Sequence, residues 1–166
     1  MSSQQWFALY TRPRFERRAA EMLSRQGIEN WLPLHKVKKQ WSDRVKWVEE
    51  PVFKSYIFVR ISEREYFHTL NTYGVVRFVT FGGQAAAISE SQMDFLRRLL
   101  DTGYELETVS LDLETGDQVE IVKGPLAGRR GVLISRAGSK KMRVDLEMLG
   151  KSIFITVPIE NLLKIS

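Results

Sequence analysis

The side chains best placed to do chemistry in this sequence are arginines that follow directly on a short aromatic segment. Arg14, Arg17, Arg18 and Arg25 lie on one predicted helix, with only Glu16 and Glu21 as acidic residues beside them. Guanidinium groups attract phosphates, so the cluster is a candidate contact for nucleic acid. The common alternative is a solvated helix face whose charges have no specific partner. Arginines of this kind would hold a phosphate backbone, and they carry no readable base specificity.

The sequence contains few of the residue types and motifs on which catalysis depends. There is no cysteine, and the two histidines, His35 and His68, are far apart. Disulfides and thiolate metal sites are therefore excluded. No glycine-rich phosphate loop and no paired carboxylates in a recognisable motif are present. We expect no metal, no cofactor and no enzymatic activity.

The charge of the chain is unevenly distributed. The 166 residues carry a net charge of +5, which suits an anionic partner. Residues 1–105 hold 16 basic and 12 acidic side chains, whereas residues 106–166 hold 9 and 8. A nucleic-acid contact is therefore expected in the first part. No apolar run is long enough to span a membrane, and the N-terminus lacks the pattern of a secretory signal, so a cytoplasmic location is expected.

The arginines must be positioned by a helix between two strands. Phe15, Ala19, Met22 and Leu23 recur at helical spacing, and Gly27 follows at the position of a C-cap. The predicted elements up to residue 100 are strands at 6–10, 28–37, 52–60, 75–81 and 85–88, a hairpin within 36–48, and helices at 15–26, 62–72 and 89–100. This mixture of helices and antiparallel strands predicts an α+β sandwich of the ferredoxin type.

The predicted hairpin within residues 36–48 combines lysines with two tryptophans, Trp41 and Trp47. Basic and aromatic residues together can bind nucleic acid by charge and stacking. A twisted hairpin whose tryptophans cover its root is the more common arrangement. We expect that structural role for Trp41 and Trp47, and we leave the role of the lysines open.

The last third of the chain reads as a small all-β domain. Strands are expected near 117–123, 131–136, 140–147 and 151–157, with a final apolar segment at 159–165 and turns at Gly138-Ser139 and Leu149-Gly150-Lys151. Four glycines and Pro125 shape the loop between the first two strands. Five short strands in so few residues predict a small β-barrel.

The spacing Gly-Asp-x-Val-x-Ile-x-x-Gly-Pro-Leu-x-Gly-x-x-Gly-x-Leu, from Gly116 to Leu133, resembles the KOW motif. Together with the opening Trp6-x-x-x-Tyr10 and the run from Gly74 to Gly82, it resembles the NusG family of transcription elongation factors. The resemblance covers nearly the whole chain. It implies a ferredoxin-like NGN domain at 1–103, a linker at 104–114 and an SH3-like KOW barrel at 115–166. Trp41-Ser-Asp-Arg-x-x-Trp47 and the following strand look most like the specialised RfaH and UpxY-type paralogues.

The resemblance also implies partners for the first domain. The family's N-terminal domain takes the clamp helices of the largest RNA polymerase subunit in an aromatic cavity and thereby suppresses pausing and termination. The matching positions are Tyr10, Phe53, Tyr56, Phe58 and Phe81. The last of these is a candidate for the rim of the cavity. A core role is the alternative for these rings, above all for Phe58 in a central strand. Arg12, Arg14, Arg17 and Arg18 lie where RfaH-like domains meet the non-template DNA strand.

Pro125 and Leu126 match the KOW loop that meets a small-subunit ribosomal protein or Rho, and we expect Leu126 to be exposed there. Glycines and β-branched residues oppose the helical form that this domain takes in RfaH. The resemblance thus implies a monomeric antitermination factor for long operons such as surface-polysaccharide clusters. A general NusG is the first alternative. A ribosome- or RNA-binding KOW protein is the second, and it would call for a more basic barrel.

Overall fold

The computed structural model describes residues 3–103, 106–110, 116, 118–136, 139–146, 149, 151–158 and 161–165. The chain forms two compact units, Met1–Glu90 and Ser91–Ser166. The helix α3 (Glu90–Asp101) is thereby grouped with the second unit. Its amphipathic sequence pattern predicts a helix with one buried face and does not say which core that face joins. The domain limits at 103 and 114 stay predictions.

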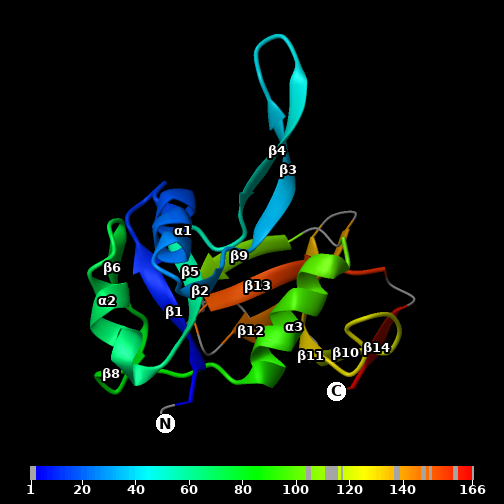
Figure 1. The fold of residues 1–166 in the computed structure, drawn as a ribbon. Helices are drawn as coiled ribbons and strands as arrows, with labels where there is room; N and C mark the ends of the chain where they lie inside the picture. Colours follow the sequence, from blue (N-terminus) through cyan, green and yellow to red (C-terminus); the bar gives the residue numbers. More distant parts are fainter. Residues whose placement is uncertain are drawn as a thin grey trace. The chain divides into compact units, whose positions relative to one another are not determined.

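A four-stranded antiparallel sheet forms the centre of the first unit (Figure 1). Its strands, in the spatial order β2-β5-β1-β6, are β2 (Glu29–Trp31), β5 (Tyr56–Ile61), β1 (Gln5–Thr11) and β6 (Val75–Phe78). In the central pair, Gln5 lies opposite Ile61 and Tyr10 lies opposite Tyr56. The predicted central strand is confirmed, but it begins at Tyr56 because residues 52–55 form a turn.

Helices cover one face of this sheet. Alternate residues of a strand point to opposite faces, so Ile57, Val59 and Ile61 lie together on the helix side. They are buried there with Leu9, Leu23, Ile28 and Phe78. The helix α1 (Glu16–Arg25) confirms the prediction for 15–26. The helix predicted at 62–72 is shorter, with one 3₁₀ turn, η1 (Glu63–Glu65), before α2 (Tyr66–Leu70).

A separate hairpin projects from the first unit, formed by β3 (Leu34–Gln40) and β4 (Val45–Pro51) (Figure 1). The single strand predicted at 28–37 is thus divided into β2 and β3, which are separated by Leu32 and Pro33. Proline has no N–H for a ladder hydrogen bond, which favours a break there. A second small pair, β7 (Thr80–Phe81) and β8 (Gln84–Ala85), continues from β6 after an interruption at Val79.

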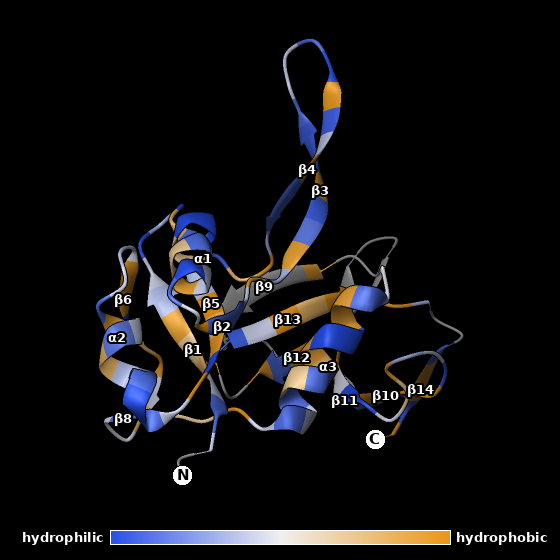
Figure 2. Cartoon of the chain, in the orientation of Figure 1, coloured by the Kyte–Doolittle hydropathy of each residue, from blue (hydrophilic) through white to orange (hydrophobic). Residues whose placement is uncertain are grey.

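The two tryptophans of the hairpin do not cover its root, as the sequence led us to expect. Trp41 is 52% exposed and Trp47 is 63% exposed. Figure 2 shows mostly hydrophilic residues along this hairpin and hydrophobic residues along β1. The hairpin extends beyond the sheet, so no apolar surface of the first unit lies beneath these rings.

The second unit contains α3 and a six-stranded antiparallel sheet in the order β14-β10-β11-β12-β13-β9. The strands are β9 (Leu106–Ser110), β10 (Gln118–Ile121), β11 (Arg130–Arg136), β12 (Ser139–Leu146), β13 (Lys151–Thr156) and β14 (Leu162–Lys164). Alternate residues such as Val119 and Ile121, or Met142 and Val144, are buried. The predicted strands in this part are confirmed to within a few residues. Gly131 is required by close packing, because a Cβ there would meet the carbonyl oxygen of Arg143.

One strand of this sheet lies in the range predicted as a linker. Leu106–Ser110 forms β9 and pairs with β13, from Leu106 opposite Ile155 to Ser110 opposite Lys151. Its sequence, Leu-Glu-Thr-Val-Ser, lacks a regular alternation, so the pattern indicated at most that residues 108–111 lead into the barrel and did not predict a strand from Leu106. The rest of the predicted linker, at 104–105 and 111–114, and the turn residues Gly138 and Gly150 lie outside the described residues.

Within the described parts of the chain, no helix is long and apolar enough to cross a membrane. Within the same ranges, no three side chains of histidine, aspartate or glutamate gather as they would around a metal ion.

The turn that leads into β5 is held by a buried carboxylate. Ser55 has a φ of 66°, a left-handed conformation that is strained for residues other than glycine. Its N–H donates a hydrogen bond of 2.9 Å to the carboxylate of Glu16, whose side chain is buried. Its carbonyl accepts a hydrogen bond of 2.9 Å from the N–H of Thr11 at the end of β1. These two bonds fix the entry of β5 into the sheet.

We predict that Ser55→Gly raises the free energy of unfolding by about 1 kcal/mol, because glycine adopts this φ without strain. Urea unfolding monitored by circular dichroism measures the change. Ser24→Gly, in the last turn of α1, is the control and is expected to lower stability by about 0.5–1 kcal/mol, since glycine is a poorer helix former than serine and the hydrogen bond of 2.9 Å from the Asn30 side chain to the Ser24 hydroxyl is lost. Equal losses in both variants would contradict the strained turn.

Candidate functional site

An aromatic cluster lies on the face of the first sheet opposite to α1. The pairing of β1 with β5 places Tyr10 beside Tyr56, with ring centroids 4.8 Å apart. Phe58 is two residues further along β5, on the same face. Its ring lies 5.6 Å from that of Trp31 in β2 and 6.1 Å from that of Phe53 in the preceding turn. Four of the five aromatic residues predicted for the site are thus brought together.

The members of this cluster differ in burial. Phe58 is completely buried, Phe53 is 2% exposed and Tyr56 is 5% exposed, whereas Tyr10 is only partly buried. The two phenylalanines therefore form the base of the cluster and Tyr10 lies at its accessible edge. The fifth predicted residue, Phe81, lies in β7 and is 49% exposed. The structure does not bring it into the ring contacts of the other four.

A cation borders the cluster at Tyr10. The guanidinium carbon of Arg77 in β6 lies 4.5 Å from the centroid of the Tyr10 ring, in the geometry of a cation–π contact. Burial and hydrogen bonding with Tyr10 raise the pKa of the Tyr56 phenol well above its ordinary value, although Arg77 partly opposes the shift. Tyr56 is therefore neutral at physiological pH. The sequence analysis did not identify Arg77 and Trp31 as site residues. The one signal that could have identified Arg77 is that it is the single charged residue in the apolar run 75–79.

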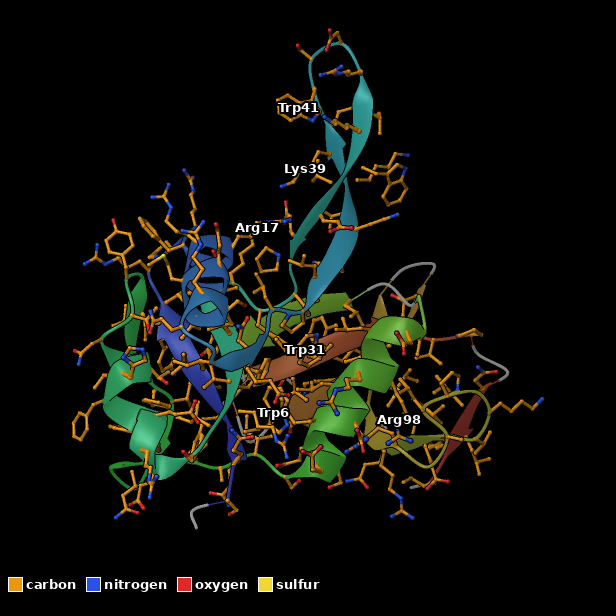
Figure 3. The ribbon with its side chains drawn as sticks, viewed as in Figure 1. Trp6, Arg17, Trp31, Lys39, Trp41 and Arg98 are labelled. Atoms are coloured by element: carbon orange, nitrogen blue, oxygen red, sulfur yellow. The ribbon has the colours of Figure 1, made fainter. Side chains whose placement is uncertain are left out.

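The four predicted arginines are exposed on α1 and on the turn before it. Arg12 lies over the Tyr73 ring and Arg18 over the Phe15 ring, each with its guanidinium carbon 5.8 Å from the centroid. Arg17 donates a hydrogen bond of 2.9 Å to the carbonyl of Glu49 in β4 (Figure 3). In the described ranges, none of the four forms an ion pair with a carboxylate. Their charge is therefore available to a phosphate.

The predicted partner loop of the second unit is tightly folded. Its backbone N–H groups at Ala127 and Arg129 donate to the carbonyls of Gly124 and Leu126, respectively, with donor–acceptor distances of 3.1 Å each. Pro125 is exposed. Leu126 is only 3% exposed, so the expectation that it is exposed is wrong. The folded loop turns Leu126 inward, which the position of the residue after Gly-Pro did not reveal.

Leu126 lines a hollow of about 460 Å³ together with Phe95 and Arg98 of α3. The guanidinium carbon of Arg129 lies 3.7 Å from the Phe95 ring centroid on the same side of this unit. Burial, with a contribution from the neighbouring charge of Arg98, lowers the pKa of Arg129. The loop and α3 thus form one packed apolar and cationic contact within the second unit.

The chain is similar to known proteins over nearly its whole length. Residues 4–97 match the family model described as "Transcription termination factor nusG". The "Transcription termination/antitermination protein NusG" of Staphylococcus carnosus is 22% identical over 179 residues, covering 99% of this chain and 98% of that protein. The protein of the same name from Streptococcus pyogenes serotype M3 is 26% identical over 157 residues, 87% of each. The structure reported as "Domain interaction in Thermotoga maritima NusG" shares the fold, with a TM-score of 0.67, 21% identity and 98% coverage of both chains.

The burial of Leu126 predicts that Leu126→Ala lowers the free energy of unfolding by about 2–4 kcal/mol, through lost apolar contacts and the cavity left behind. Leu163→Ala is the matched control, because Leu163 is 55% exposed in the same unit. It is expected to change stability by less than about 0.5 kcal/mol. Thermal and urea unfolding of the full chain measure both. Two equally small effects would show that Leu126 is exposed in solution.

Proposed function

We propose that this chain, which belongs to the NusG family, binds RNA polymerase through its first unit. The chain is a NusG-like transcription termination/antitermination factor rather than an enzyme. The observation that carries this proposal is the aromatic cluster of Tyr10, Phe53, Tyr56 and Phe58. Tyr10 is distant in the sequence from the other three, and the resemblance assigns all four positions to the cavity for the polymerase clamp helices. They gather on one face of one sheet.

Each residue of the cluster has a role in this proposal that its burial supports. Phe53 and Phe58 are the apolar base that holds the ring positions above them. Tyr10 contacts the clamp helices, because it is partly exposed and a tyrosine offers a large apolar face together with a hydroxyl for hydrogen bonding. Tyr56 is 5% exposed, so it takes a smaller part in the contact and holds the Tyr10 ring in position. Arg77 adds a cation at the edge of the same contact. Phe81 is exposed and serves as an additional contact outside the cluster.

Binding of this kind changes transcription by shifting the population of polymerase conformations. A factor that contacts both sides of the polymerase cleft binds the closed clamp with more contacts than the open clamp. It therefore favours the closed state by its difference in affinity for the two. Pausing and termination, which need clamp opening, become less frequent. We expect the factor to act in the cytoplasm as a monomer, without a cofactor.

Nucleic acid is a proposed second partner of the first unit. Arg12, Arg14, Arg17 and Arg18 lack carboxylate partners among the described residues and are exposed, so they suit the phosphates of the non-template DNA strand. Such contacts position the factor and lose strength as salt increases.

The second unit is proposed to be a KOW barrel that recruits a small-subunit ribosomal protein or Rho. Pro125 is available on the surface for such a contact. Leu126 is buried, so its participation requires the loop to leave its packed position in the second unit.

A specialised role, like that of RfaH and UpxY-type paralogues, is the finer part of the proposal. Its support is one short segment: general NusG proteins usually have Pro-Gly-Tyr where this chain has Lys54-Ser55-Tyr56. Ser55 here takes the left-handed conformation that glycine adopts freely. A general elongation factor is the alternative.

We predict that Tyr10→Ala weakens the binding of the full chain to core RNA polymerase by tenfold or more, as expected when a tyrosine that anchors an interface is removed. Fluorescence anisotropy with labelled protein measures the dissociation constant. Tyr56→Phe accompanies it, since it keeps the buried ring and removes only the hydroxyl.

Phe67→Ala is the matched control for this experiment. Phe67 is 72% exposed in α2, on the helix side of the same unit, and its loss should leave polymerase binding unchanged. Circular dichroism confirms that each variant is folded. A folded Tyr10→Ala protein that binds like the parent would refute the cavity assignment.

The specialised role predicts where the factor acts in a cell. Sequencing of nascent transcripts bound to the tagged protein should give a strong enrichment on one or a few long operons, because a specialised factor is recruited selectively. An even distribution over all transcribed genes would refute the specialised role and indicate a general factor.

A further inference from the structure

The projecting hairpin β3–β4 exposes more apolar and cationic surface than its own stability needs. Its strands pair from Leu34 opposite Pro51 to Gln40 opposite Val45, and a hydrogen bond of 2.8 Å from Trp41 N–H to the Arg44 carbonyl closes the turn. At about 3.3 Å per residue, each seven-residue arm is roughly 23 Å long. The distal half stands clear of the rest of the first unit (Figure 1).

Each face of this ribbon carries one exposed indole next to lysines. Directly opposed residues share a face, and alternate residues of a strand change face. Trp47 is paired with Lys38, so these two lie on one face. Lys39 and its partner Lys46 lie on the other face, and the same alternation, continued one residue past the end of β3, places Trp41 there as well. Figure 3 shows Trp41 and Lys39 on the hairpin.

Lys36, near the base of the hairpin, lies opposite the acidic Glu49, whereas the basic residues of the distal half have no carboxylate as a cross-strand partner. Residues 36–48 contain five basic side chains, Lys36, Lys38, Lys39, Arg44 and Lys46, and the one acidic side chain of Asp43. Lys39 forms an ion pair of 2.5 Å with Glu50. The other four basic side chains form no ion pair within the described part of the chain. Lys39 and Lys46 are direct cross-strand partners, and like charges in that position destabilise a hairpin.

From this arrangement we propose that the hairpin is a binding site for single-stranded nucleic acid, with Trp41 and Trp47 stacking on unpaired bases and the lysines contacting phosphates. Stacking on aromatic rings together with a basic surface is how proteins bind single strands without sequence preference. Phosphates would also remove the repulsion between Lys39 and Lys46. A duplex satisfies the lysines and leaves the rings unused, because its bases are already stacked on one another.

The hairpin is continuous with the arginine surface of α1. The hydrogen bond from Arg17 to the Glu49 carbonyl joins the helix to the second arm of the hairpin. A strand bound along the hairpin therefore leads towards the arginines proposed above to contact DNA. The inference deepens the nucleic-acid part of the proposed function. Binding of a single strand at the hairpin needs no RNA polymerase, so this inference and the proposed polymerase binding can fail separately.

Fluorescence anisotropy of the full chain with a fluorescein-labelled 12-nucleotide DNA of mixed sequence tests the proposal at low salt. Matching RNA and the matching DNA duplex are the comparison probes, and the two single strands show which sugar is preferred. We expect at least one single strand to bind at least tenfold more tightly than the duplex. We expect the double variant Trp41→Ala/Trp47→Ala to lose at least tenfold of that affinity.

Two further variants separate stacking from charge. Trp41→Phe/Trp47→Phe keeps an aromatic ring at both positions and should retain most of the affinity. Lys38→Gln/Lys46→Gln should reduce the slope of affinity against salt concentration, because fewer counterions are released. Phe67→Ala, an exposed ring elsewhere in the unit, should change nothing.

Three results would overturn the proposal. One is a folded double alanine variant that binds single strands as well as the parent does. Another is tighter binding of the duplex than of both single strands. The third is a double alanine variant that loses affinity for RNA polymerase alone, which would make the hairpin a protein-binding element. If Tyr10→Ala loses polymerase binding while the single-strand affinity is kept, both proposals stand.

Discussion

The hydrogen bond between the Glu16 carboxylate and the Ser55 N–H determines much of the first unit. It joins the first turn of α1 to the residue that precedes β5, and the Ser55 carbonyl in turn accepts from Thr11 at the end of β1. The register of the two central strands is therefore set at the end where Tyr10 meets Tyr56. A slip of β5 by one residue would move Tyr56 and Phe58 to the helix side. The buried carboxylate thus holds one end of the strand pair that carries the candidate binding face.

The first unit carries two kinds of surface, one on each side of the contact between Glu16 and Ser55. The sheet face opposite to the helices carries packed rings, whose positions are fixed by neutral contacts and by Arg77. The helix α1 and the hairpin carry cations that are mostly unpaired within the described residues. The first kind suits a protein surface of defined shape, and the second suits a flexible polyanion. The proposed function uses both kinds of surface, the first for RNA polymerase and the second for nucleic acid.

Periodicity predicted the elements better than it predicted their neighbours. The helical spacing of Ala19 and Leu23 and the alternation around Ile57 gave α1 and β5 nearly within their observed limits, because both patterns reflect local burial. The sequence predicted that Trp41 packs against the root of the hairpin and that Leu126 is exposed, and both predictions were wrong. Each depends on whether a segment distant in the sequence brings an apolar surface close to the residue. The positions of the site residues came from the family resemblance. Arg77 and Trp31 were missed because only strand pairing brings them to the cluster.

The positions of the four tryptophans allow the protein to be studied by its intrinsic fluorescence. Trp6 is 4% exposed and donates a hydrogen bond to Glu90, and Trp31 packs beside Phe58 in the aromatic cluster. The other two indoles of the chain lie in water on the hairpin. Buried and hydrated indoles emit at different wavelengths, so one emission spectrum contains a blue component from the sheet and a red component from the hairpin. Quenching by iodide would remove the red component first, which allows events at the two surfaces to be followed separately without a label.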